Sequence, residues 1–342
     1  MSNPLQDFGR AHGRRRATGM TLVELMVALA IGSFLLLGAV TVFVQSRSTF
    51  RVADSVSRLQ ENARFVLDRL EPDIRMAGYF GLTSRPTKLL GRAGPDDPAG
   101  LGPQECETNW AINVEAVVEA TNNGYAWGTG CDPFGGTAAA DADTLIVRRV
   151  SEDEITGSLD ANTLYVQSAR SVDGQIFQGT TVPTLPGTSQ THRLIVNGYY
   201  VSQTSTLSTT DNTIPSLRVK RLTSGAGGPV VVDEEVLPGV EDFQVQLGVD
   251  TDAVGAAGRG SIDRYVNPGD GILVEGSATF IPDAQVLAVR IWVRLRALDP
   301  EVGYTDSTNY VYADQNVAAF NDAFRRIVVS KTIFLRNART VI

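Results

Sequence analysis

Side chains able to carry out acid–base, nucleophilic or metal chemistry are sparse in this chain. Among 342 residues there are two histidines, His12 and His192, and two cysteines, Cys106 and Cys131. Histidine is the usual proton carrier near neutral pH, and the cysteines lack the C-x-x-C spacing of zinc and redox sites. Walker A, G-x-G-x-x-G and G-x-S-x-G motifs do not occur in the sequence. The sequence therefore predicts no catalytic residues, no cofactor and no enzyme.

Two groups of carboxylates are the remaining candidates for chemistry. The first surrounds the turn at Pro238-Gly239 and consists of Glu234, Glu235, Glu241 and Asp242. A Pro-Gly turn between two β-type runs is typical of a hairpin. We therefore interpret these four carboxylates as the solvated charges of a hairpin and not as an acid–base pair.

The second group lies in the glycine-rich stretch 247–266 and consists of Asp250, Asp252 and Asp263. This spacing weakly resembles a calcium loop. However, Val254 stands at the third carboxylate position, and no glutamate follows at the spacing of the EF-hand. We expect a polar β-turn here, with a weak calcium site as the alternative, and assign no metal.

The basic residues at the start of the chain contrast with its overall charge. The formal net charge is −8, so direct binding of nucleic acid is not expected. The first nineteen residues nevertheless carry four arginines, at positions 10, 14, 15 and 16, against one aspartate. A basic start on an acidic protein is typical of a membrane-topology signal.

An uncharged apolar run follows, over residues 25–44. This length spans the hydrocarbon core of a bilayer as a helix and exceeds the apolar region of an ordinary secretory signal. The preceding arginines place residues 1–19 in the cytoplasm and the bulk of the chain on the other side. Glu24 stands at the edge of the span, where an acid is costly and is by default a functional candidate.

The junction GRRRATG–MTLVELMVAL, residues 13–29, resembles the class III leader of type IV pilins and pseudopilins. The resemblance implies that a prepilin peptidase cleaves between Gly19 and Met20 and N-methylates Met20, so that the apolar helix stays on the mature protein. It also implies that Glu24 sets the register of assembly by pairing with the Met20 amine of a neighbouring subunit. A signal anchor that is not cleaved is the alternative given by hydropathy alone.

The polar stretch after the span keeps helical periodicity. Apolar residues recur at three- and four-residue steps, at positions 52, 56, 59, 63, 66, 70 and 74, and this predicts one face that packs on a sheet. We expect Pro72 to kink or end the helix and Gly78 to stop it. The segment 60–81 resembles PilW-type minor pilins, and PulJ-type minor pseudopilins share a looser version of it.

Beyond the helix, residues 79–140 are rich in Gly, Pro and Asp and indicate loops. Cys106 and Cys131 enclose much of this stretch and predict one disulfide in an oxidising compartment. Trp110, Tyr125 and Trp127 are expected to pack over the bridge, with a ligand surface as the alternative. Short alternating or β-branched runs then predict strands. They cover residues 144–150, 163–169, 193–201, 216–222, 229–236, 243–249, 286–298 and 326–336. In the seventh run, Arg290, Arg294 and Arg296 alternate with apolar residues, which predicts a half-exposed strand. The basic residues of 325–337 are expected on a solvated strand face, with a contact to a partner pilin as the alternative.

These observations predict an α+β, pilin-like protein. The expected parts are a cleaved leader (1–19), a transmembrane and filament-core helix (20–44), its amphipathic continuation (45–78), a loop region with the disulfide (79–140) and a β-rich head (141–342). The resemblance implies an inner-membrane, single-pass protein with a periplasmic head that later joins a pilus on the cell surface. Its implied partners are the prepilin peptidase, the inner-membrane assembly platform, other minor pilins and the major pilin, and a PilY-type tip adhesin.

The resemblance also implies a role in starting pilus assembly and at the pilus tip, which supports adhesion and twitching motility. A PulJ-type pseudopilin of type II secretion is the first alternative. A membrane-tethered periplasmic binding domain is the second.

Overall fold

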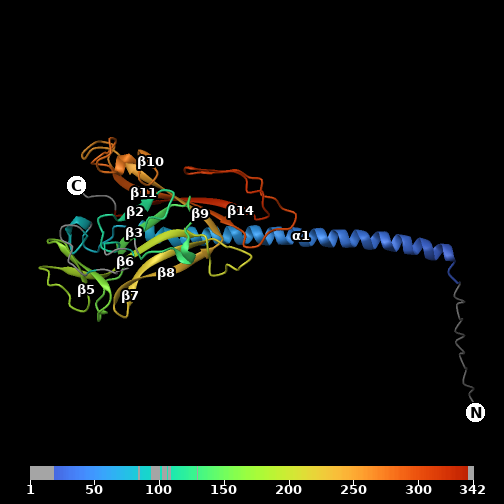
Figure 1. Ribbon diagram of the computed structural model, residues 1–342, viewed down its shortest axis with the longest axis horizontal. Coiled ribbons are helices and arrows are strands. Elements are labelled where there is room, and N and C mark those ends of the chain that lie inside the picture. Colours follow the sequence, from blue (N-terminus) through green and yellow to red (C-terminus); the bar gives the residue numbers. More distant parts are fainter. Residues whose placement is uncertain are drawn as a thin grey trace, which may run out of the picture. The chain divides into compact units, whose positions relative to one another are not determined.

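The computed structural model describes residues 19–83, 85–93, 101, 106, 109–128 and 130–337 (Figure 1). The predicted leader therefore lies outside the described residues, apart from Gly19. The chain divides into two compact units, residues 1–54 and 55–342.

One helix, α1 (Leu22–Arg75), is the main feature of the N-terminal part. It is long and apolar enough to cross a membrane. No proline interrupts it before Pro72, and the Met76 N–H donates to the Pro72 carbonyl at 3.1 Å. Gly78 then adopts φ +74°, a left-handed conformation that favours glycine and ends helices. The prediction that the helix ends near Pro72 and Gly78 is confirmed.

Strands β1 to β8 form an eight-stranded sheet with the order β1-β5-β4-β6-β3-β2, and β7 and β8 are added beside β6. Every pair is antiparallel except β1 with β5. The strands are β1 (Leu89–Leu90), β2 (Val118–Thr121), β3 (Thr144–Val150), β4 (Leu164–Ala169), β5 (Gly174–Gln178), β6 (Ser189–Ser202), β7 (Ser216–Gly225) and β8 (Gly228–Pro238).

A second, four-stranded antiparallel sheet has the order β10-β9-β11-β14. Its strands are β9 (Val240–Asp250), β10 (Arg264–Val266), β11 (Gln285–Arg296) and β14 (Arg326–Phe334). Between β11 and β14 lies a small hairpin of β12 (Tyr310–Tyr312) and β13 (Gln315–Val317). Short 3-10 turns occupy Pro86–Lys88, Phe134–Gly136 and Gly271–Leu273.

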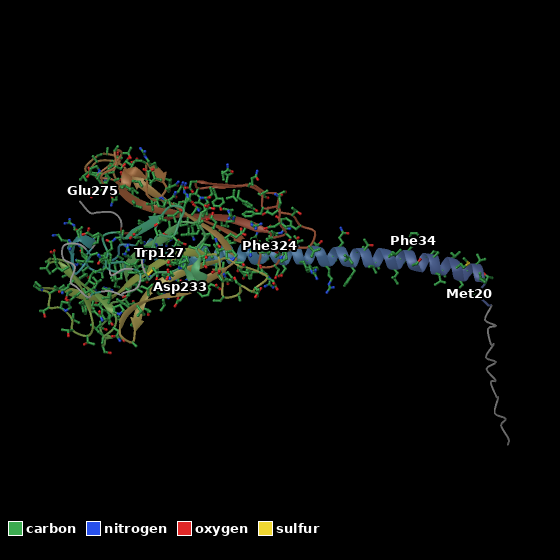
Figure 2. The ribbon with its side chains drawn as sticks, in the orientation of Figure 1. Met20, Phe34, Trp127, Asp233, Glu275 and Phe324 are labelled. Carbon is green, nitrogen blue, oxygen red and sulfur yellow. A yellow bond between two sulfur atoms is a disulfide. The ribbon has the colours of Figure 1, made fainter. Side chains whose placement is uncertain are left out.

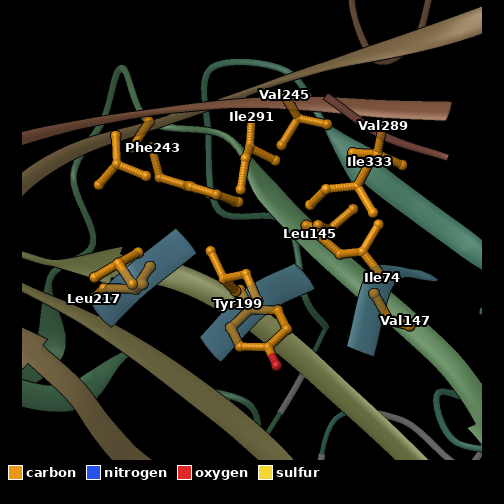
Figure 3. Packing of buried hydrophobic residues seen from close by; sticks show 14 of the residues in the cluster. Ile74, Leu145, Val147, Tyr199, Leu217, Phe243, Val245, Val289, Ile291 and Ile333 are labelled. Carbon is orange, nitrogen blue, oxygen red and sulfur yellow. The ribbon is translucent and has the colours of Figure 1, made fainter. Parts of the chain in front are cut away.

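The second half of α1 packs into a core built from both sheets (Figure 3). Leu59, Ala63, Val66, Leu70 and Ile74 are all buried there, as their periodicity predicts. The sheet side chains that meet them come from β3, β6, β7, β9, β11 and β14, and include Leu145, Tyr199, Leu217, Phe243, Ile291 and Ile333. The prediction of an α+β fold, with a long N-terminal helix on a β-rich domain, is confirmed.

All eight predicted strands are present, with ends that differ by a few residues. The sequence reading missed β1, β2, β5, β10, β12 and β13, which are short strands of two to five residues. A strand this short shows too few alternations to stand out from a polar loop.

The predicted hairpin at Pro238-Gly239 is wrong. Strand β8 before the turn pairs with β7 in the large sheet, whereas β9 after the turn pairs with β10 and β11 in the other sheet. The chain changes sheets at this point. Gly239 has φ +84°, and a Cβ there would lie 2.8 Å from the Arg296 carbonyl oxygen, so this crossing requires glycine.

Candidate assembly site

Gly19 and Met20, the predicted cleavage pair, are exposed and precede the first helical residue, Leu22. Glu24 lies in the first turn of α1. Its Oε2 accepts hydrogen bonds from the Thr21 N–H at 2.9 Å and the Thr21 hydroxyl at 3.0 Å, and the Glu24 N–H lies 3.3 Å from Thr21 Oγ1. This reciprocal arrangement is a capping box.

The capping box was missed in the sequence, although the T-x-x-E pattern before an apolar run signals it. It gives Glu24 an intrachain partner that is neutral and supplies no positive charge. The first turn of a helix favours a negative side chain. Glu24 therefore caps α1 within the chain, and its pairing with a cation of a second chain stays a prediction.

The span itself presents an uncovered apolar surface. Its large side chains are exposed throughout, and Phe34 projects freely from the helix (Figure 2). Ala28, Gly32 and Ser33 line a shallow hollow on this helix together with four leucines. Small residues let a second helix approach closely within a membrane, so this surface suits helix–helix packing.

Asp73 ties the end of α1 to the large sheet. This buried carboxylate accepts from Arg149 Nε at 2.7 Å, Asn197 Nδ2 at 2.8 Å and the Tyr199 hydroxyl at 2.8 Å. Burial and the nearby Asp73 charge raise the pKa of Tyr199. Nothing in the local sequence distinguishes Asp73 from the other helical acids, because its partners lie on β3 and β6.

The predicted disulfide between Cys106 and Cys131 is present, with Cα atoms 4.4 Å apart. Trp110 and Trp127 are buried beside it and contact each other at 6.4 Å between ring centroids. The Tyr125 hydroxyl donates to the Cys131 carbonyl, and burial raises the pKa of Tyr125. The expected packing of aromatics over the bridge is confirmed, and Figure 2 places Trp127 within the head.

The three calcium candidates come together, with one carboxylate oxygen from each of Asp250, Asp252 and Asp263 within 4.8 Å of the others. Asp250 accepts from the N–H groups of Asp252 and Gly260, and Asp263 accepts from Thr251. Hydrogen bonds from the backbone N–H and the hydroxyl of Thr251 lower the pKa of Asp263. The carboxylates thus close the turn through hydrogen bonds, and calcium binding here stays a prediction.

The four acids around Pro238-Gly239 do not form one solvated group. Glu234 is exposed, but Glu235 accepts from Arg218 and Thr206 within the large sheet. Glu241 and Asp242 lie on β9 of the four-stranded sheet. They belong to a largely buried ionic cluster whose other members are Arg294, Arg326, Asp306 and Tyr312.

This cluster also corrects the expectation for the arginines of β11. Arg294 is buried because the segment after β11 folds back over it: Tyr312 accepts from its Nη1 at 2.6 Å, and Phe320 stacks on its guanidinium at 5.0 Å. Arg326, at the start of β14, is buried between Glu241, Asp306 and Asp322. Its expected solvated position is therefore wrong. The sequence of a strand shows which residues alternate between its two faces, but it does not show whether another segment covers one of those faces.

Comparison with known proteins gives two family matches. Residues 14–40 match the prokaryotic N-terminal methylation motif, and residues 198–337 match the family described as Type IV Pilus-assembly protein W. The second match begins in β6 and includes all of the four-stranded sheet. The C-terminal part of the chain is therefore similar to the PilW family of type IV pilus-assembly proteins, and its N-terminus carries the methylation motif.

The two matches indicate a minor pilin involved in pilus assembly, which is a structural and non-enzymatic class of protein. Its leader motif and apolar helix fit inner-membrane anchoring, and the family implies a prepilin peptidase and other pilins as partners. A type IV-like pilin from Thermus thermophilus is 14% identical over 84% of this chain and 97% of that protein, with a TM-score of 0.35. No curated protein matches the chain.

Proposed function

We propose that this protein is a PilW-type minor pilin that helps to initiate type IV pilus assembly and takes a place in the complex at the pilus tip, where it supports adhesion and twitching motility. The observation that carries the proposal is an uncovered apolar helix that begins just after the predicted cleavage junction and has one acid, Glu24, in its first turn. A helix of this kind is complete only when other helices pack around it. Its proposed partners are other minor pilins, the major pilin, a PilY-type tip adhesin and the assembly platform.

The proposed mechanism is non-covalent once the leader has been removed. Cleavage after Gly19 creates a new amine on Met20, and methylation leaves that amine basic. The amine of one subunit pairs with the Glu24 carboxylate of the next, which removes the cost of an unpaired acid in an apolar bundle. The pair fixes the axial register of the helices, and the head domain then selects neighbours.

The first experiment measures the mass and N-terminal sequence of the protein purified from membranes, beside a Gly19→Arg variant. We expect a chain that starts at N-methylated Met20, and we expect Gly19→Arg to keep its leader. An intact Met1 terminus in a strain with an active prepilin peptidase would contradict the proposal. It would favour the membrane-tethered binding domain instead.

A matched pair of variants separates the two uses of Glu24. Glu24→Gln keeps a capping side chain at the third helical position but removes the charge, so we expect normal processing and a loss of at least tenfold in pilus incorporation, because register requires the ion pair. Thr21→Val removes the cap and keeps the charge, and we expect incorporation within about twofold of the wild type. The measurement is the amount of protein in sheared pili. Equal incorporation of Glu24→Gln and the wild type would contradict the register role.

The PulJ-type alternative predicts incorporation into a secretion pseudopilus. The PilW-family match favours the pilus, and deletion strains distinguish the two. Loss of surface pili supports the proposal, whereas loss of type II secretion with normal pili supports the alternative.

A further inference from the structure

The edge of the four-stranded sheet formed by β14 is open. Strand β14 pairs with β11 on one side only, in an unbroken register over nine residue pairs. Two hydrogen bonds at the ends of the ladder fix which backbone groups face outward. The Ala297 N–H donates to the Arg325 carbonyl, and the Leu335 N–H donates to the Leu287 carbonyl. Odd-numbered residues of β14 therefore face β11, and the N–H and C=O groups of the even-numbered residues 328, 330, 332 and 334 point to the edge.

No other backbone group in the described part of the chain bonds to these outward groups. Proteins usually blunt such an edge with short strands, prolines or charges. The long edge strand β8 follows this rule, since it contains Pro229, Pro238 and three successive acids. Strand β14 contains no proline, and Phe334 on it is 63% exposed. The charge of Lys331, its one lysine, pairs with Asp68 and Glu71 on α1.

A groove runs along this edge, between β14 and the second half of α1. Its apolar lining comes from Ala63 and Leu67 of the helix and from Ile327 and Val329 of the strand. Ser330, whose backbone points outward, also lines it. A strand added here would extend the sheet over the uncovered flank of α1 and would place every second side chain in the groove.

The positive charge of Arg64 at the groove indicates which side chain the added strand should carry. Arg64 lines it, is exposed and makes no hydrogen bond or ion pair with other described residues. An acidic side chain on the incoming strand would complement it.

We propose that β14 is a docking edge for an extended segment of another polypeptide, a strand with alternating apolar residues and an acid that reaches Arg64. The unpaired backbone ladder requires a strand and neither a helix nor a small molecule. The proposal is independent of the proposed function, because processing at Gly19 and packing of the span use none of these residues.

The test uses the full mature chain in detergent micelles and a synthetic nine-residue peptide that alternates valine with threonine, with one glutamate. Hydrogen exchange should show the amides of residues 328, 330, 332 and 334 unprotected in the free protein and protected with the peptide. Protection already present in the free protein would mean that the chain itself or a second copy fills the edge. Protection that grows with protein concentration would point to the second copy. Either result would overturn the proposal, as would no protection with the peptide.

Matched variants locate the binding. Ser330→Pro removes an outward N–H and spares the ladder to β11, so we expect affinity for the peptide to fall at least tenfold, whereas Ser330→Thr should stay within about twofold. Thr332→Pro repeats the test, and unchanged urea midpoints show that both proline variants fold. Arg64→Glu should weaken binding of the peptide about fivefold, and this variant should bind more tightly to a peptide that has lysine in place of glutamate. Equal binding by both proline variants and the wild type would overturn the proposal.

The two proposals fail separately. If the peptide does not bind while Met20 is methylated and the protein enters pili, the docking edge is wrong and the proposed function stands. If the peptide binds as expected while Met1 is retained, the reverse holds.

Discussion

At the scale of single residues, Asp143 is a buried carboxylate that has no cationic partner among the described residues. It stands just before β3, and its two oxygens accept from the N–H groups of Asn123 and Val245, at 2.8 and 2.7 Å. Val245 lies on β9, so this one side chain joins the two sheets. Burial outweighs both hydrogen bonds and raises the pKa of Asp143 from 3.8 to about 7.

This raised pKa predicts a pH dependence of stability. Between pH of about 4 and about 7 the folded chain binds more protons at Asp143 than the unfolded chain does, so the free energy of unfolding falls as the pH rises. We expect a contribution of roughly 1–3 kcal/mol over this range. The asparagine of Asp143→Asn cannot ionise. The free energy of unfolding of this variant should therefore lack the fall that Asp143 contributes between these pH values. Urea unfolding at pH 5 and 7.5 measures both slopes, and identical slopes would contradict the assignment.

At the scale of elements, the attachment of α1 to the large sheet combines an apolar stripe with one polar clasp. The stripe is continuous, but apolar surfaces slide past one another at low cost. Asp73 restricts this sliding, because its partners Arg149, Asn197 and Tyr199 occupy fixed places on β3 and β6. A buried network of this kind fixes the axial position of the helix end.

Removal of this clasp should be costly. Asp73→Ala leaves a largely buried arginine and two buried polar groups without their acceptor, and we expect a loss of about 3–5 kcal/mol in the free energy of unfolding. Asp68→Ala, five residues earlier on the same helix, is the control. The Asp68 side chain is 62% exposed and its nearest cation, Lys331, is 3.5 Å away, so its loss should cost less than about 1 kcal/mol. Similar losses in urea unfolding for both variants would contradict the clasp.

At the scale of the whole molecule, the two units have different requirements. Every residue of the two buried cores lies at or after Leu59, whereas the large side chains of the span are exposed. The span is therefore stable only in a membrane or a bundle of helices, while the head buries its own apolar surface.

This division predicts that the head folds without the span. A chain that starts at Gln45, exported to the periplasm, should form the Cys106–Cys131 disulfide. It should unfold in one cooperative transition, with a urea midpoint within about 10% of that of the full chain in detergent. Thiol labelling and urea unfolding check both points. A free thiol or a non-cooperative transition would show that the span contributes to the head.

The sequence by itself determined the features that depend on local order. The basic leader, the apolar run, Glu24 and the Gly19–Met20 junction are contiguous, so their spacing alone predicts a membrane helix and, by resemblance, a pilin. The apolar stripe of α1 and the eight longer strands follow from periodicity in the same way, since each extends over enough residues to show its repeat.

Only the tertiary structure decided how distant polar residues are paired. The change of sheets at Pro238-Gly239, the clasp at Asp73 and the burial of Arg294 and Arg326 all depend on partners far away in the sequence. The open edge of β14 belongs to the same class, because a strand's sequence does not state whether a neighbour lies on each side. Hydrogen bonds and ion pairs form wherever the folded backbone brings the groups together, and that placement is a property of the whole fold.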